Sequence, residues 1–111
     1  NITARFDSVA GLQERAKVTT AGVVIGRVTN ITLDPSDIRA VVTMAIKKDV
    51  DYLATDTNAA IQTAGVLGEK YIALSVGVDE ETLHAGDEIT DTTSAVVLEE
   101  LIGKVMSAMT K

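Results

Sequence analysis

Short apolar segments that alternate with polar positions fill the first ninety residues of the chain, and turn residues separate them about every 8–12 positions. This two-residue period is typical of β-strands, whose successive side chains point to opposite faces of a sheet. The pattern predicts strands over residues 2–7, 17–20, 23–34, 38–48, 58–63, 70–76 and 88–90. Gly26 interrupts the third strand and predicts a bulge or bend, and residues 34–37 (DPSD) predict a turn.

The period changes near the C-terminus, where residues 94–109 carry apolar side chains at steps of three and four. That spacing predicts an amphipathic helix, because such positions share one helix face. The apolar stripe comprises Leu98, Leu101, Ile102, Val105, Met106 and Met109. It can pack on the β-domain or pair with copies of itself, and the sequence leaves both open. We expect an all-β barrel or sandwich over residues 1–91 and a C-terminal α-helix over residues 92–111.

The apolar residues of the chain are aliphatic rather than aromatic. Valine, threonine and isoleucine together make up a third of the 111 residues, which favours strands over helices. A hydrophobic share of 46% excludes a disordered chain, and the length fits a single domain. The aromatic residues are only Phe6, Tyr52 and Tyr71. Sites for sugars and for single-stranded nucleic acids usually bind through stacking on aromatic side chains, so the low aromatic content argues against both kinds of site.

Charge and cysteine content narrow the function classes further. The net charge of −6 argues against binding to nucleic acid and against docking to an anionic membrane surface through a basic patch. The chain has no cysteine and one histidine, so disulfides, cysteine-ligated zinc and histidine-rich metal sites are excluded. We expect no cofactor. No apolar run approaches 18 residues, and the first residue is Asn1, so we expect a processed piece that a targeting or membrane segment preceded.

Candidate catalytic groups are few. His84 is the single histidine and lies in a polar, acidic turn, without a G-x-S-x-G motif or a cysteine nucleophile elsewhere. Acidic residues gather at 49–56 and 79–81, but the calcium-loop spacing fails, because Ala54 and Ala60 stand where glycine and glutamate are needed. A carboxylate enzyme built on these acids is a remote hypothesis. We expect no catalytic residue and no metal ligand.

One loop is chemically unusual. Gly65-Val66-Leu67-Gly68 places two aliphatic residues between two glycines, at the tip of a predicted hairpin where side chains are normally polar. Each such side chain left in water forgoes about 1.5–3 kcal/mol of burial. The loop therefore either folds back into the core or meets something apolar, and the residues alone favour the fold-back. The same letters match the G-x-x-G loop of KH domains, but the net charge and the absence of flanking helices argue against that interpretation.

Five segments together resemble the mammalian cell entry (MCE) domain, and within that family the MlaD-type subunit of Gram-negative phospholipid transport. They are FDSVAGL (6–12), AGVVIGRV (21–28), ITLDP (31–35), IQTAGVLGEKYIALSVG (61–77) and AGDEITDTTSAVVLEELIG (85–103). The resemblance covers nearly the whole chain, with its segments in the expected order. Many members have glycine at the positions of Arg15 and Ala21, and a proline near Leu53 or Ala54. These departures concern local turn geometry and not the family.

The resemblance implies a seven-stranded β-barrel that assembles as a homo-hexameric ring. The family's pore loop falls on Gly65–Gly68, so Val66 and Leu67 would line a central hydrophobic pore that conducts phospholipid. In MlaD-like members the C-terminal helices gather around the axis of the ring. The same resemblance implies a periplasmic domain, anchored to the inner membrane by an N-terminal transmembrane helix absent from this chain.

The partners that the resemblance implies are an ABC permease and ATPase and a soluble periplasmic lipid carrier, which together maintain the lipid asymmetry of the outer membrane. The chain itself has no G-x-x-x-x-G-K-[ST] motif, so the energy for transport would come from elsewhere. The resemblance shifts the interpretation of the loop from fold-back to pore lining. The alternative hypothesis is a monomeric β-barrel that acts as a binding or adaptor domain, with Val66 and Leu67 in its own core.

Overall fold

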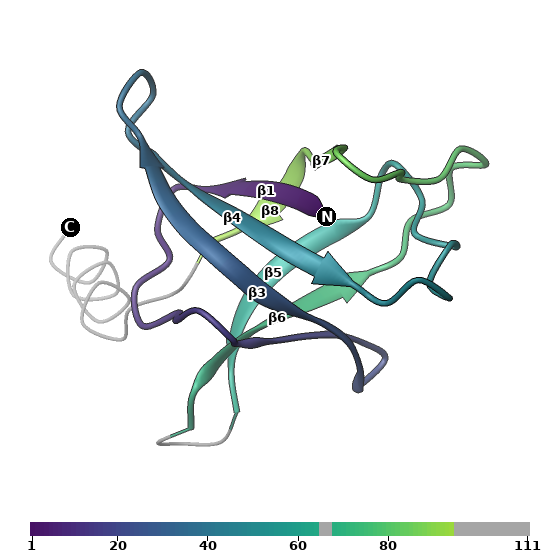
Figure 1. Cartoon of the computed structure of the whole chain (residues 1–111), viewed down its shortest axis with the longest axis horizontal. Coiled ribbons are helices and arrows are strands. Elements are labelled where there is room, and N and C mark those ends of the chain that lie inside the picture. The colour runs from purple at the N-terminus through teal and green to yellow at the C-terminus, as the bar shows by residue number, and fades with distance from the viewer. Residues whose placement is uncertain (65–67, 95–111) are drawn as a thin grey trace, which may run out of the picture.

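The computed structural model describes residues 1–64 and 68–94, which form one eight-stranded sheet (Figure 1). The strands are β1 (Ile2–Phe6), β2 (Lys17–Thr20), β3 (Val23–Asp34), β4 (Arg39–Ile46), β5 (Asn58–Thr63), β6 (Lys70–Ser75), β7 (Glu88–Ile89) and β8 (Asp91–Thr93). The all-β prediction is confirmed. The C-terminal helix is expected over residues 92–111, but its first two residues, Thr92 and Thr93, belong to β8, because they pair with β5. Residues 95–111, which carry the apolar stripe, lie outside the described residues. Within the two described ranges there is no helix that could cross a membrane.

The sheet is nearly closed into a barrel by a single short segment. In the strand order β7-β1-β4-β3-β2-β6-β5-β8, the two end strands are consecutive in sequence and separated only by Thr90. β7 pairs in parallel with β1, and β8 pairs in parallel with β5. The segment therefore spans the gap between the two edges that β1 and β5 would otherwise expose. This exchange of partners divides the expected strand at 88–90 into β7 and β8 and carries it on to Thr93.

Hydrogen bonds from side chains, in addition to the backbone pairing of the sheet, hold β8 and Ser94 against the end of β1. The hydroxyl of Thr92 donates a hydrogen bond to the carbonyl of Arg5 over 2.8 Å. The hydroxyl oxygen of Ser94 accepts hydrogen bonds from the backbone N–H groups of Asp7, at 2.9 Å, and Ser8, at 3.3 Å. These contacts satisfy backbone groups that β1 leaves free where its pairing ends. Side-chain hydrogen bonds thus help to hold the barrel closed between β1 and β8, where the paired strands are shortest.

The core follows the alternation that the sequence predicts. In β1 the side chains of Ile2, Ala4 and Phe6 point inward and are buried, while Thr3 and Arg5 between them are half-buried. Apart from Phe6, the core is built from aliphatic and methionine side chains. Its buried members are Ile2, Ala4, Phe6, Leu12, Val18, Ile25, Val28, Val42, Met44, Leu53, Ala59, Ile61, Ile72, Leu74 and Ile89.

The predicted irregularity at Gly26 is confirmed as a bulge in β3. Val18 of β2 pairs with Gly26, but Thr19 pairs with Val24, so Ile25 is the extra residue on the bulged strand. A side chain at position 26 would overlap the carbonyl oxygen of Ala45 on the neighbouring strand β4. Glycine is therefore needed here because the two backbones approach too closely for a Cβ atom.

Two positions where MCE domains often carry glycine keep a glycine-like backbone in this chain. Arg15 has a φ of +73° and Ala21 a φ of +51°, both in the left-handed region. Ala21 and Gly22, with a φ of +80°, form the two-residue turn between β2 and β3, and two positive φ values are what a type I′ hairpin turn requires. The substitutions thus leave the turn geometry in place and add strain to it.

Replacing Ala21 with glycine is expected to raise the free energy of unfolding by about 0.5–1 kcal/mol. The change removes a left-handed penalty of about 1–2 kcal/mol, and part of that gain is lost to the greater freedom of glycine in the unfolded chain. Urea denaturation would measure the difference. Ala10, exposed and without a positive φ, provides the control, and Ala10→Gly should lower stability. Destabilisation by Ala21→Gly would contradict a left-handed backbone at this position.

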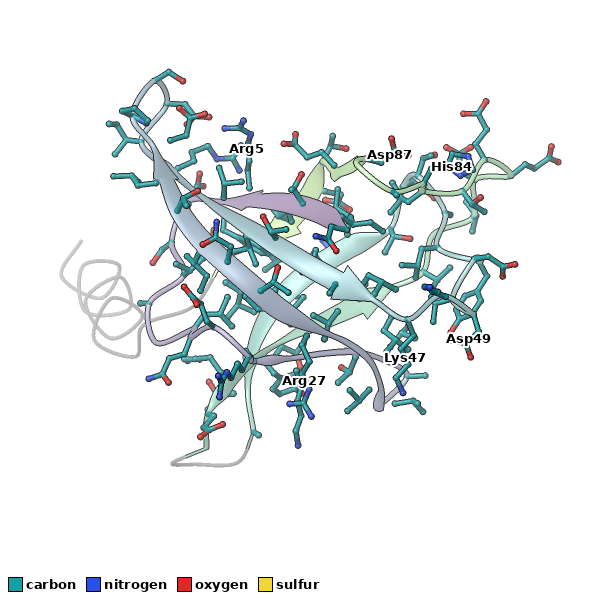
Figure 2. All side chains as sticks on the ribbon, in the orientation of Figure 1. Arg5, Arg27, Lys47, Asp49, His84 and Asp87 are labelled. Carbon is teal, nitrogen blue, oxygen red and sulfur yellow. The ribbon has the colours of Figure 1, made fainter. Side chains whose placement is uncertain are left out.

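A network of charged side chains braces the β3–β4 hairpin against β1 and β7. The guanidinium of Arg5, which is labelled in Figure 2, lies 2.5 Å from the carboxylate of Asp34, 3.4 Å from that of Asp37 and 3.0 Å from that of Glu88. The hydrogen bond from Arg5, with further bonds from the backbone and hydroxyl of Ser36, lowers the pKa of Asp34 to about 2. The same bond from Arg5 to Asp34 raises the pKa of the guanidinium. The pair of Arg5 and Asp34, at the turn end of this hairpin, therefore stays ionised near neutral pH.

Candidate functional site

The described arms of the β5–β6 hairpin, on either side of the unusual loop in sequence, extend away from the core. Cross-strand pairs run from Ile61 and Ile72, both buried, to Thr63 and Lys70, and the N–H of Ala64 then donates to the carbonyl of Glu69 over 3.1 Å. Beyond the two isoleucines the hairpin becomes polar and largely exposed. Figure 1 shows this end of the hairpin extending beyond the rest of the described barrel. The neck of the loop is therefore solvent-facing.

Of the predicted pore-loop residues, the structure describes Gly68. A Cβ atom at this position would overlap the carbonyl oxygen of Ala64 across the neck. Only glycine lets the two arms of the hairpin approach this closely, which gives Gly68 a structural reason independent of any pore. Gly65, Val66 and Leu67 lie outside the described residues, as does the helix stripe from Leu98 to Met109.

Two adjoining clefts flank the neck of this hairpin. The larger, of about 430 Å³, is lined by Gly11, Gln13, Glu14, Arg15, Ala16, Gly68, Glu69 and Lys70. The smaller, of about 180 Å³, is lined by Arg15, Ala16, Lys17, Arg27, Ala64, Glu69, Lys70 and Tyr71. Four residues are common to both linings, so the clefts form one continuous depression beside the loop.

The segment before β2 forms the outer wall of this depression and is pinned at several points. Buried Leu12 anchors it in the core. The N–H of Arg15 donates to the carbonyl of Val28 over 2.7 Å, and the N–H of Val28 donates to Ala16 over 2.9 Å. A Cβ atom at Gly11 would lie 3.1 Å from the Cγ atom of Lys70, so this turn packs closely on the lysine stem. The walls are thus built from three separate parts of the chain: the segment over residues 11–16, the β2–β3 pair and the β5–β6 hairpin.

The smaller cleft is strongly cationic. Its lining contains Arg15, Lys17, Arg27 and Lys70, and its one acidic member is Glu69. Across residues 1–64 and 68–94, the ion pairs within 4 Å involve Arg5 and Arg39 and none of these four cations. Sequence reasoning missed this cluster, because the four residues are scattered along the chain. The turn at Ala21-Gly22 indicates in the sequence that Lys17 and Arg27 share a hairpin, and nothing in the sequence indicates the pairing of β2 with β6 that adds Lys70.

Some of the other groups considered as candidate chemistry take part in hydrogen bonds that hold the local fold. The carboxylate of Asp56 accepts hydrogen bonds from the N–H groups of Asp79, at 3.0 Å, and Val78, at 3.1 Å, and these bonds lower its pKa. The backbone N–H of His84 donates to the carboxylate of Asp87 over 2.7 Å. Among the described residues, no three histidine or acidic side chains gather closely enough to hold a metal ion. Figure 2 shows Asp87 and His84 together, across the barrel from Arg27.

Comparison with known proteins points to one family. A family profile described as "MlaD protein" matches residues 1–77. A relative from Haemophilus influenzae, named intermembrane phospholipid transport system binding protein MlaD, is 44% identical over 108 residues, and a protein of the same name from Escherichia coli K12 is 43% identical over 108 residues. The alignments take in 95% and 93% of the chain, whereas the chain spans 65% and 59% of the length of these relatives.

A solved structure is similar over most of the fold. A chain of the Acinetobacter MlaFEDB complex in the ATP-bound Vtrans1 conformation superposes with a TM-score of 0.86 at 30% sequence identity. The match covers 94% of the present chain and 79% of that chain. The barrel is therefore an arrangement that a chain of the MlaFEDB complex also adopts.

Proposed function

Because the chain belongs to the MlaD family, we propose that it is a non-enzymatic, phospholipid-binding subunit of an intermembrane transport system. The observation that carries the proposal is the β5–β6 hairpin, whose solvent-facing neck presents a loop of sequence Gly-Val-Leu-Gly. The names of the relatives support the ligand, since both are binding proteins of phospholipid transport.

Simple energetics explain why such a subunit needs an aliphatic surface. A phospholipid has on the order of 30 methylene groups, and exposing each to water costs about 0.8 kcal/mol, so bare transfer costs roughly 25 kcal/mol. A protein that passes the lipid between membranes must shield the tails along the route. Val66 and Leu67 offer aliphatic contact without the ring geometry that would bind one ligand tightly.

The assembly that we propose is a homo-hexameric ring in which six copies of this loop line a central hydrophobic pore. A helix within residues 95–111, with its stripe of Leu98, Leu101, Ile102, Val105, Met106 and Met109, would gather with its copies around the axis. The ring would lie on the periplasmic side of the inner membrane. Its partners would be an ABC permease and ATPase below it and a soluble lipid carrier above it.

Native mass spectrometry combined with lipid extraction tests this proposal. The purified chain is expected to give a species of six copies of the 11.7 kDa protomer, with phospholipid recovered from the protein fraction. A protein of matched size without lipid affinity, carried through the same cells and columns, controls for contaminating lipid. A strict monomer at high concentration that carries no phospholipid would contradict the ring and favour the monomeric adaptor.

A further inference from the structure

We infer that the cationic cleft beside the β5–β6 hairpin binds the phosphate group of the phospholipid whose tails contact the neighbouring loop; this rests on the proposed function. Arg15, Lys17, Arg27 and Lys70 surround a space of about 180 Å³, in a chain whose net charge is −6. The positive charge of this cleft is opposite in sign to the net charge of the whole protein. Arginine and lysine side chains bind phosphate oxygens through charge-assisted hydrogen bonds.

The pairing of the strands shows that this clustering works against stability. Lys17 of β2 and Arg27 of β3 are directly opposite each other in the antiparallel register. Like charges at such positions repel and destabilise a sheet. The described acidic residues do not relieve the repulsion through an ion pair. An anionic ligand placed between the two cations would do so, which is the pattern expected of a binding site and not of a structural pair.

Two of the four cations have side chains oriented by hydrogen bonds within the fold. Arg27 donates a hydrogen bond from its guanidinium to the carbonyl of Arg15 over 3.3 Å, and the ammonium of Lys70 donates to the hydroxyl of Thr63 over 2.5 Å. Arg15 itself is held in a left-handed backbone conformation, at a φ of +73°. The parallel register of Val18 with Ile72 brings Lys17 beside Tyr71, which lines the same cleft.

Residues that line the two clefts also flank the aliphatic loop in the sequence, which favours the phosphate of a lipid over a free phosphate ion. Ala64 lines the smaller cleft and Gly68 lines the larger, and these two residues flank the loop of Val66 and Leu67 on either side. Because the chain is continuous, residues 65–67 lie within a few residue lengths of the cleft, so a ligand with its phosphate in the cleft would have its acyl chains within reach of these aliphatic side chains. A free phosphate ion would gain nothing from that neighbour, whereas a phospholipid uses both surfaces.

Titration of the chain with three probes tests the inference. The probes are dihexanoylphosphatidylglycerol below its micelle concentration, dihexanoylglycerol, which has the same tails without phosphate, and inorganic phosphate. Backbone amide shifts of the isotope-labelled protein report the dissociation constant and the residues affected. We expect the phospholipid to bind most tightly, to shift amides of β2, β3 and β6, and to weaken between about 50 and 300 mM NaCl, because exposed charges are screened.

Matched variants separate the cleft from the rest of the surface. Lys17→Gln with Arg27→Gln is expected to weaken phospholipid binding about tenfold, because two charge-assisted hydrogen bonds to the phosphate are removed, and to leave dihexanoylglycerol binding unchanged. Lys47→Gln with Lys48→Gln removes the same charge from residues that line neither cleft, and should change binding less than about twofold. The melting temperature of the cleft variant should hold or rise, because its like-charge repulsion is gone.

The remaining outcomes overturn the inference. Unchanged phospholipid binding in the cleft variant, when charge at Val66 and Leu67 abolishes it, would refute the cleft and keep the proposed function. Equal affinity for inorganic phosphate would identify an ion site and refute the lipid assignment. A cleft variant that changes oligomeric state while binding lipid normally would show a subunit contact instead. Binding of neither lipid by the unmodified chain would refute the proposed function together with the inference.

Discussion

Replacing Phe6 with alanine is expected to lower the free energy of unfolding by about 3–5 kcal/mol. Phe6 is the one phenylalanine of the chain, its side chain is fully buried, and it pairs through β1 with Ala40 of β4. The surrounding core is aliphatic, so neighbouring side chains have few ways to fill the space that a ring vacates. A domain of this size has about 5–15 kcal/mol in total, so the loss is a large part of it.

Urea denaturation with a shared m-value gives the measurement, and two variants control it. Phe6→Leu keeps most of the volume and should cost less than about 2 kcal/mol. Tyr52→Ala removes an aromatic ring that is 49% exposed, and should cost no more than about 1 kcal/mol. If Phe6→Ala costs no more than Tyr52→Ala, the inner face of β1 is not the core of this barrel.

Local sequence patterns predict much of the fold. β2, β3 and β5 begin and end at the residues predicted for them, because turn residues such as Ala21-Gly22 and Asp34-Pro35 stand at their ends. The bulge at Gly26 was also predicted, since a glycine inside an apolar strand signals close backbone approach. These features depend on residues near one another in sequence, which is why the sequence alone suffices for them.

Features that depend on distant partners were not predictable in the same way. The division of the last expected strand at Thr90 follows from pairing with β1 on one side and β5 on the other, and no local pattern in residues 88–93 encodes two partners. Ile38 was expected to begin a strand, as its β-branched side chain favours. It instead adopts a φ of +54°, because its N–H donates to the carbonyl of Asp34 and closes the turn.

The candidate site likewise has one feature that the sequence predicts and one that it does not. The Gly-Val-Leu-Gly loop stood out because aliphatic residues at a hairpin tip conflict with exposure, which is a local contradiction visible in the sequence. The cationic cleft could not be found this way. Lys17 and Lys70 are far apart in sequence and meet through the parallel pairing of β2 with β6. The net charge of −6 indicates the total balance and is silent about where the cations gather.

Charging the loop is expected to abolish phospholipid binding. In Val66→Asp with Leu67→Asp, each aliphatic side chain that no longer covers a lipid tail forgoes about 1.5–3 kcal/mol, so affinity for the lipid should fall about 100-fold or more. Because the neck of the hairpin is solvent-facing, the melting temperature should stay within about 3 °C of the unmodified chain. Dihexanoylphosphatidylglycerol titration and thermal denaturation, run on the same preparations, measure both quantities.

A matched control exists within the same barrel. Val23→Asp with Leu33→Asp makes the same two substitutions at side chains that are 63% and 62% exposed, and it should leave phospholipid affinity unchanged. A large fall in melting temperature for the loop variant alone would mean that Val66 and Leu67 pack into the protomer's own core, as in the monomeric adaptor. Unchanged affinity at unchanged stability would instead remove the loop from the lipid path, because a side chain that shields acyl chains cannot be ionised without cost.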